Sequence, residues 1–463
     1  MDKVSDMGEA PLGGLLLRFS LPSIAIMLVN GLYNFVDRIF IGQGMGTDAL
    51  AAVTAGFPMM LLAEGIGALL SVGASTLMSI AMGAEKREEA SSVLGQAFLA
   101  AVAAAIPVMA ISWLFMDPIL GVFGTPEAIM PLARTYIGII TGGFLFQIVS
   151  MAVANSLRSQ NRPRSAMVAT VSGTFLNAIL APLFIFAFKW GIAGAAWATV
   201  IAQAFSVALT LAFIQEGKSL LRIELHNLAP RAATVASMAR IGAPLFLVHV
   251  LALAMLIVAN NSMARFGGTT ALAVIGIINT VSQLLTFPIM GITQGAGTLW
   301  GYNFGAGKID RIKRLTVLVA AWTTLIGIAC TGVIELFPRS FVSAFNSSDP
   351  ALLALGSRGM TIFMLSFFTV GLQFTVATFF MSIGKAAQGG ILYVLRQILL
   401  IAGMALLPRF MGLDGVLWSG PFTDLACVAV SGILLSAGFR ALRPAAMGNA
   451  ERVAVVEGAA APR

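Results

Sequence analysis

Charged side chains are scarce in this sequence. Only 10% of its 463 residues are Asp, Glu, Lys or Arg, whereas soluble domains contain about a quarter. The hydrophobic fraction is 58%, and the mean hydropathy of +0.92 is far above what a soluble core requires. These proportions exclude a secreted enzyme, a nucleic-acid binder and a disordered scaffold. They predict an integral membrane protein.

Cysteine and histidine are also rare. The two cysteines, Cys330 and Cys427, lie inside apolar runs, so neither a disulfide framework nor a cysteine metal site is expected. His249 has no second His or Cys near it in sequence, and we interpret it as an interior side chain. No HExxH or GxGD motif occurs. We therefore expect a protein that is not an enzyme and holds no metal or bound cofactor. The segment Met1 to Pro11 is acidic and polar, unlike a cleavable signal peptide.

Long apolar runs dominate the rest of the chain. Each is long enough for a transmembrane helix, and each is too long and too uniformly apolar for the strands of a barrel. We predict an all-α integral membrane protein with 12 transmembrane helices. The predicted spans are 15–42, 49–82, 93–116, 132–157, 165–188, 191–214, 241–264, 270–298, 315–337, 360–383, 389–408 and 413–439.

The basic residues predict the orientation. With the N-terminus in the cytoplasm, the termini and the loops after spans 2, 4, 6, 8 and 10 hold 20 of the 28 Lys and Arg residues. The positive-inside rule then places both termini in the cytoplasm. The net charge of +8 is thus a topology signal, and we expect no nucleic-acid partner. Because the composition is rich in Ala and Arg and poor in Lys, we expect the cytoplasmic membrane of a GC-rich bacterium.

The sequence repeats itself at a shift of 222 residues. Pro22 pairs with Pro244, Gly46 with Gly268, and Gly83 with Gly305. Near the end of each copy the shift becomes 221, which pairs Gly191, Gly194 and Trp197 with Gly412, Gly415 and Trp418. Each copy contains six spans, an even number, so both enter the membrane in the same direction.

This parallel repeat is typical of secondary transporters that bind substrate near the midplane, between the halves. We predict two six-helix bundles around a central cavity. The predicted divisions are an N-lobe over 1–214, a cytoplasmic linker over 215–240, a C-lobe over 241–440 and a cytoplasmic tail over 441–463.

Two acids lie within the apolar runs of the N-lobe. Asp37 is about 20 residues into the first span and Glu64 is midway along the second. An acid inside a membrane span usually has a function, and one that faces a cavity can exchange protons. Asp37 could instead pair with Arg38, and Glu64 could make a polar contact between helices. The corresponding C-lobe positions are Ala259 and Thr286, so ion-linked chemistry is expected in the N-lobe.

Other polar side chains in the spans divide between helix packing and the cavity. Asp424 and Arg396 are interpreted mainly as packing residues, with Arg396 pairing with an acid or extending toward the interface. The polar residues expected in the cavity are Tyr33, Asn34, Asn177, Thr199, Gln203, Asn260 and Gln283.

Three segments, in this order, resemble the multidrug and toxic compound extrusion (MATE) transporters, and more closely their DinF-like bacterial branch. They are Leu32–Gly42 (LYNFVDRIFIG) after Leu21-Pro22, Gly73–Glu85 at the end of span 2, and Gly301–Ala306 (GYNFGA) at the end of span 8. The resemblance covers nearly the whole chain. It implies alternating access and export of amphipathic, often cationic compounds, driven by protons or sodium.

The resemblance also implies roles for particular residues. It makes Asp37 the coupling acid of the first helix, with Asn177 and Thr199 in the same polar cluster. The chain departs from the branch at Ala181, where an Asp is usual, and it lacks the acids on helices 7 and 10 of the NorM-like branch. A C-lobe sodium site is therefore not supported. Coupling falls to Asp37, aided by Glu64.

Several alternatives remain open. A proton suits a single acid better than sodium, which needs several oxygen ligands, although Asn34, Asn177 and Thr199 could supply neutral ones. A flippase or exporter of a lipid-linked or other amphipathic metabolite is the second hypothesis. The expected partners are small amphipathic molecules and the lipid bilayer, and we expect a monomer.

Overall fold

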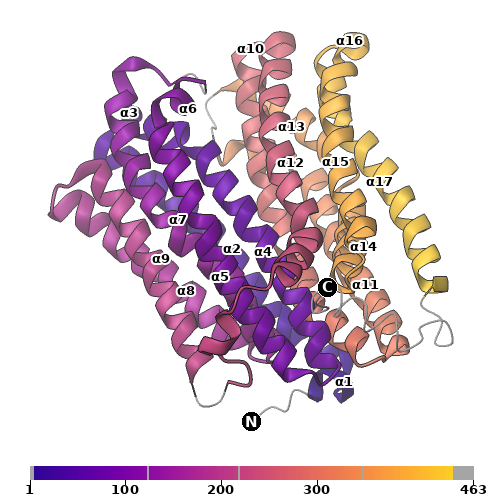
Figure 1. Cartoon of the computed structure of the whole chain (residues 1–463). Helices are drawn as coiled ribbons and strands as arrows, with labels where there is room; N and C mark the ends of the chain where they lie inside the picture. Colours follow the sequence, from indigo (N-terminus) through magenta and orange to yellow (C-terminus); the bar gives the residue numbers. More distant parts are fainter. Residues whose placement is uncertain (1–4, 123–124, 217–218, 346–348, 442–463) are drawn as a thin grey trace.

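A computed structural model describes residues 5–122, 125–216, 219–345 and 349–441, and no strand occurs in these ranges. The helices of the first half stand on one side of the molecule in Figure 1, from indigo to magenta, and those of the second half on the other, from pink to yellow.

The first half contains α1 (Asp6–Glu9), α2 (Leu12–Met45), α3 (Thr47–Ala55), α4 (Phe57–Gly83), α5 (Arg87–Leu114), α6 (Met116–Val122), the 3-10 helix η1 (Glu127–Ile129), α7 (Met130–Ser159), α8 (Pro163–Pro182), the π-helix η2 (Leu183–Ala187) and α9 (Gly191–Gln215). The second half contains the 3-10 helix η3 (Leu225–Leu228), α10 (Ala232–Gly305), α11 (Ile309–Leu336), α12 (Pro338–Ser343), α13 (Pro350–Met364), the 3-10 helix η4 (Phe367–Thr369), α14 (Val370–Ser382), α15 (Ala386–Leu406), α16 (Pro408–Met411) and α17 (Leu413–Ala441).

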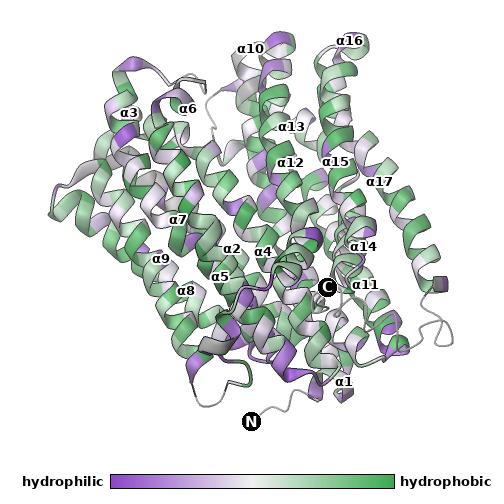
Figure 2. Cartoon of the chain, in the orientation of Figure 1, coloured by the Kyte–Doolittle hydropathy of each residue, from purple (hydrophilic) through white to green (hydrophobic). Residues whose placement is uncertain are grey.

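The predicted spans are confirmed. Among the described residues, 12 helical segments are long and apolar enough to cross a membrane, and each overlaps one predicted span. Hydrophobic side chains cover the long helices, whereas hydrophilic ones gather at the ends of the molecule (Figure 2). Large apolar side chains such as Leu114, Ile179 and Leu336 are exposed along the spans, as contact with lipid requires. The chain is a multi-pass membrane protein.

Capping residues explain why one span starts earlier than its apolar run. The tenth span begins at Pro350 rather than at residue 360. The Asp349 side chain accepts hydrogen bonds from the backbone nitrogens of Ala351 and Leu352, and proline fits the first helical position. These polar signals extend the helix beyond the hydrophobic segment that predicts it.

The backbone repeats as the sequence does. The left-handed glycines Gly46 (φ 79°) and Gly268 (φ 66°) lie 222 residues apart, and each follows the first span of its half. Gly191 (φ 57°) and Gly412 (φ 59°) lie 221 apart, and each precedes the last span. Since only glycine adopts this conformation readily, these pairs preserve the same reversals in both halves. At Gly268 the long α10 breaks into its two membrane spans.

Two glycines allow α4 and α10 to cross in close contact. A Cβ added to Gly83 would overlap the backbone oxygen of Tyr302, and one added to Gly305 would overlap that of Ile80. A shift of 222 converts the first contact into the second, so the crossing is its own image under the repeat. A twofold axis relating the halves therefore passes through this point.

Hydrogen bonds join the halves at the end of the molecule where α1 lies (Figure 1). Thr76 Oγ1 donates to Met381 O (3.4 Å), Arg158 Nη1 to Gln294 Oε1 (3.4 Å) and Asn303 Nδ2 to Met7 O (3.1 Å). In addition, Lys308 Nζ donates to Gly8 O (2.9 Å) and Arg311 Nη2 to Ala10 O (2.7 Å). This end carries the α4–α5 and α10–α11 turns.

The connection between the halves packs on the first half. Gln96 Nε2 donates to the backbone oxygens of Asn227 and Ala229, and Gln96 Oε1 accepts from Arg231 N. Gln160 Oε1 accepts from Ser219 and from two backbone nitrogens nearby. Helix α10 already begins at Ala232, before the predicted end of the linker at residue 240. Residues 442–463 of the predicted tail lie outside the described part of the chain.

Candidate functional site

Helices α2, α8 and α9 bring three predicted residues together. Asn177 Nδ2 donates a hydrogen bond to Thr199 Oγ1 (3.1 Å), and the hydroxyl groups of Tyr33 and Thr199 lie 3.4 Å apart. Thr199 Oγ1 donates to Ala195 O of its own helix (3.2 Å). A hydroxyl group has a single proton, so Tyr33 is the donor toward Thr199. Asn177 and Thr199 are buried.

Asp37 belongs to this polar cluster through Tyr33. The two residues are one helical turn apart on α2, and the Tyr33 hydroxyl interacts electrostatically with the Asp37 carboxylate and contacts Asn177. Asn177 Oδ1 is buried and has no hydrogen-bond partner among the described residues. We call Tyr33, Asp37, Asn177 and Thr199 the N-half cluster. It combines one acid with neutral hydroxyl and amide groups.

The position of the missing second acid is filled by apolar packing. Ala181 is only 1% exposed and packs in a small hydrophobic cluster with Phe184 and Ala198. The next residue, Pro182, lacks a backbone N–H, and the π-helical turn Leu183–Ala187 follows it directly. No carboxylate is therefore present one turn beyond Asn177, as the sequence indicates.

The other predicted residues lie outside this cluster. Gln203 lies one turn from Thr199 on α9, and a Cβ added to Gly143 of α7 would come within 3.0 Å of its Oε1. Glu64 is exposed midway along α4, where its neighbour Gly65 packs against His249 of the other half. Asn260 and Gln283 are exposed on α10. The Asn34 side chain lies outside the described part of the structure.

A second polar cluster occurs in the C-terminal half. Arg396 Nε on α15 contacts Asp424 Oδ1 on α17 at 3.2 Å, and Ser366 Oγ donates to Asp424 Oδ2 at 3.0 Å. Gln373 Nε2 donates to Asp424 O (3.1 Å) and to Thr369 Oγ1 (3.0 Å). We call Arg396, Asp424, Ser366 and Gln373 the C-half cluster. The sequence had suggested that Arg396 pairs with an acid, but it did not identify which one.

The repeat offers a signal that could have identified this site. A shift of 221 places Asp424 at the position of Gln203, which the sequence analysis assigns to the cavity. The acid and the amide therefore occupy equivalent positions on the last helix of each half. Comparing the halves position by position would have raised the interest of Asp424.

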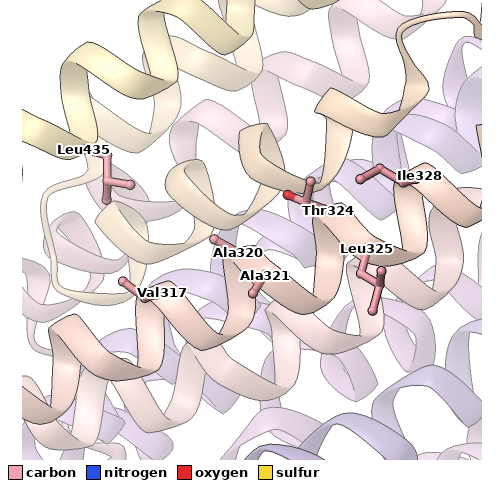
Figure 3. Close-up of a pocket in the computed structure, with 7 residues that line it drawn as sticks. All are labelled: Val317, Ala320, Ala321, Thr324, Leu325, Ile328 and Leu435. Carbon is pink, nitrogen blue, oxygen red and sulfur yellow. The ribbon is translucent and has the colours of Figure 1, made fainter.

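An open apolar groove of about 480 Å³ lies on α11 beside α17 (Figure 3). Val317, Ala321 and Ile328 line it, and Thr324 contributes its one polar side-chain group. The groove includes no residue of the N-half or C-half cluster. Its apolar lining is suited to contact with lipid.

The sequence profile of the MatE family matches this chain twice, over residues 22–183 and 244–406. The two matches begin 222 residues apart, at Pro22 and Pro244. Each match thus falls in one half of the structure.

Curated relatives support the same family. The chain is 23% identical over 427 residues to the multidrug export protein MepA of Staphylococcus aureus (strain NCTC 8325 / PS 47), covering 92% of this chain and 94% of the relative. It is 24% identical over 419 residues to MepA of Staphylococcus haemolyticus (strain JCSC1435), covering 90% and 92%.

Solved structures share the fold over nearly the whole chain. A MATE protein in a bent conformation superposes with a TM-score of 0.90 at 20% identity, covering 96% of this chain and 99% of the other. A MOP superfamily transporter from Pyrococcus furiosus Vc1 gives a TM-score of 0.89 at 21% identity with the same coverage. The twelve spans, the twofold crossing of the halves and a profile match over well over half of the sequence show that this chain belongs to the MatE family.

Proposed function

We propose that this protein exports small amphipathic compounds, often cationic, in exchange for protons, by alternating access. The observation that carries the proposal is the N-half cluster, in which a single acid inside a membrane span has neutral hydrogen-bonding neighbours. The relatives named multidrug export proteins support the substrate class.

Asp37 is the coupling acid in this proposal. Ions bound inside a membrane protein need a reversible change of charge, and a carboxyl group provides one by gaining or losing a proton. The neutral hydroxyl and amide groups of Tyr33, Asn177 and Thr199 can hydrogen-bond to either form. Sodium would need several oxygen ligands, and the apolar packing around Ala181 removes one that a second acid would provide.

The contacts between the halves suggest how access alternates. With both termini in the cytoplasm, the end joined by Arg158–Gln294 and Asn303–Met7 is the cytoplasmic end, so this conformation is open toward the outside. Rocking the halves about the α4–α10 crossing would exchange these contacts for others at the opposite end. Proton binding at Asp37 would bias that equilibrium only if the two conformations differ in proton affinity.

Efflux from proteoliposomes tests this function. Vesicles would be loaded with a fluorescent cationic dye, and efflux would be followed under an imposed proton gradient and then under a sodium gradient. The variants are Asp37→Asn, Glu64→Gln and Asp117→Asn. Asp117 pairs with Arg134 at an exposed helix end and serves as the matched control acid.

We expect proton-driven efflux in the wild type and in Asp117→Asn, and none in Asp37→Asn. An unchanged rate in Asp37→Asn would refute the role of Asp37. Sodium-driven efflux would point to the neutral ligands around this acid. If neither gradient moved any amphipathic cation, export of cations would be rejected in favour of a flippase or an exporter of an amphipathic metabolite.

A further inference from the structure

The C-half cluster lies at the middle of the membrane. Arg396 is the eleventh of 21 residues in α15, so about 15 Å of helix separates it from either end. This distance is too long for an arginine side chain to reach the interface, which is the usual way a membrane span accommodates this residue. The charge must therefore be satisfied inside the protein.

The Arg396 side chain faces away from lipid. The exposed side chains of α15 include Ile391 (52%) and Ile398 (49%). Arg396 is five residues after the first and two before the second, which places it about 140° to 160° around the helix from both. Its own side chain is 28% exposed, whereas that of Asp424 is 6% exposed. The exposed part of the guanidinium group therefore opens toward the interior of the protein.

Both sides of this cluster have unused hydrogen-bonding capacity. A guanidinium group carries five N–H donors, and only the Arg396 Nε contact to Asp424 is formed with another described side chain. Gln373 is 4% exposed, and its Oε1 atom is buried without a hydrogen-bond partner among the described residues. Its amide nitrogen is bonded to Asp424 O, which holds this free acceptor beside the ion pair. The site thus offers donors on one side and an acceptor on the other.

We propose that the C-half cluster binds the zwitterionic head of an amphipathic ligand, with an anionic group on Arg396 and a cationic group on Asp424 and Gln373. A zwitterion replaces the internal ion pair with two pairs to the ligand, so the net charge in the membrane stays at zero. A purely anionic or cationic ligand would leave an uncompensated charge there. The rings of Phe374 and Tyr393, 5.6 Å apart, provide an apolar wall next to Gln373 and one turn before Arg396.

As a statement about cargo, this inference rests on the proposed export function, but its binding test does not. Three dansyl compounds separate the charges of the ligand. Nε-dansyl-lysine is zwitterionic, dansylcadaverine lacks its carboxylate, and dansyl-aminohexanoic acid lacks its amine. Dansyl fluorescence would report the affinity of each compound for the purified full-length protein in phosphatidylglycerol nanodiscs, without any gradient.

The test variant is the neutral double substitution Arg396→Gln/Asp424→Asn, which leaves no buried charge unpaired. The matched control is Arg358→Gln/Asp414→Asn, which removes an exposed ion pair between α13 and α17. We expect the test variant to weaken dansyl-lysine binding at least about tenfold, because charge-assisted hydrogen bonds are lost. Dansylcadaverine binding should change by less than about twofold, and the control variant should bind all three compounds as the wild type does.

Absence of dansyl-lysine binding to the wild type would overturn the proposal, as would equal losses for dansyl-lysine and dansylcadaverine. If the double variant fails to fold, Gln373→Met provides the second test, because it removes the free acceptor and keeps the ion pair. We expect it to weaken dansyl-lysine binding selectively, and unchanged binding would count against the site. Efflux of dansylcadaverine under a proton gradient separately tests the export function.

A membrane lipid could supply the same head-group chemistry. Phosphatidylethanolamine carries a phosphate and an ammonium group, so the binding measurement would be repeated in nanodiscs of this lipid. Weaker dansyl-lysine binding there in the wild type, but not in the double variant, would assign the site to the lipid head group. Equal binding in both lipids would assign it to a soluble zwitterionic cargo.

Discussion

The two halves of this transporter share a backbone but carry different charges at their polar clusters. In the first half, Asp37 lies beside Tyr33, with hydroxyl and amide groups around it. In the second, Asp424 is paired with Arg396. The second acid occupies the repeat position of Gln203, whereas the position equivalent to Asp37 is Ala259.

This difference shows which features the duplication requires. The reversals at Gly46 and Gly268 and the crossing of Gly83 with Gly305 recur because both halves need the same helix packing. Side chains inside the bundles are not constrained in this way. An acid with neutral neighbours can change its protonation without breaking an ion pair, but Asp424 cannot. The first half is thus suited to proton exchange and the second to a charged ligand.

The largest effect on stability should come from breaking the C-half ion pair on one side. Either Arg396→Gln or Asp424→Asn leaves a buried charge unpaired, and we expect each to cost about 3–5 kcal/mol. The double variant should cost less than either single variant, because it leaves neither charge. Thermal unfolding of the purified protein would measure this. Single variants that are no less stable than the double one would show that the pair is not buried energetically.

The exposed pair Arg358–Asp414 provides the comparison for that experiment. Its side chains are 62% and 35% exposed, and exposed ion pairs contribute at most about 1 kcal/mol. Neutralising either partner should therefore leave the unfolding temperature nearly unchanged.

A smaller and symmetric effect is expected at the crossing of the halves. Gly83→Ala and Gly305→Ala each place a methyl group against a backbone oxygen of the other half, and overpacking of this kind costs about 1–3 kcal/mol. The two costs should be equal, because the repeat interchanges the contacts. Gly332 on α11 has no heavy atom within 4 Å of an added Cβ and serves as the control. Unequal shifts of the unfolding temperature would argue against a twofold axis at this point.

The sequence predicted the twelve spans and the repeat because both depend on signals within a single segment. A run of apolar residues specifies a membrane helix, and a glycine that must adopt positive φ persists in both copies, as at Gly46 and Gly268. The early start of α13 was not predicted, because it depends on the polar cap at Asp349.

The candidate site was predicted only in part. Asn177 and Thr199 were grouped through the family resemblance, and the structure adds the hydrogen bond that joins them. The link from Tyr33 to Thr199 spans 166 residues and depends on how α2 and α9 pack. The pairing of Arg396 with Asp424 likewise depends on the packing of α15 and α17. A hydropathy pattern gives the length of each helix, but it does not specify which faces meet.

The central claim is that cargo and proton compete through Asp37, and counting protons on ligand binding tests it most directly. A cationic dye would be added to the purified protein in weakly buffered solution, and the change in pH would be recorded for the wild type, Asp37→Asn and Glu64→Gln. Linkage requires that a ligand which displaces a proton from its site releases it to solution. We expect about one proton per bound dye in the wild type and in Glu64→Gln, and none in Asp37→Asn. Dye binding to the wild type without proton release, or equal release in Asp37→Asn, would contradict the account.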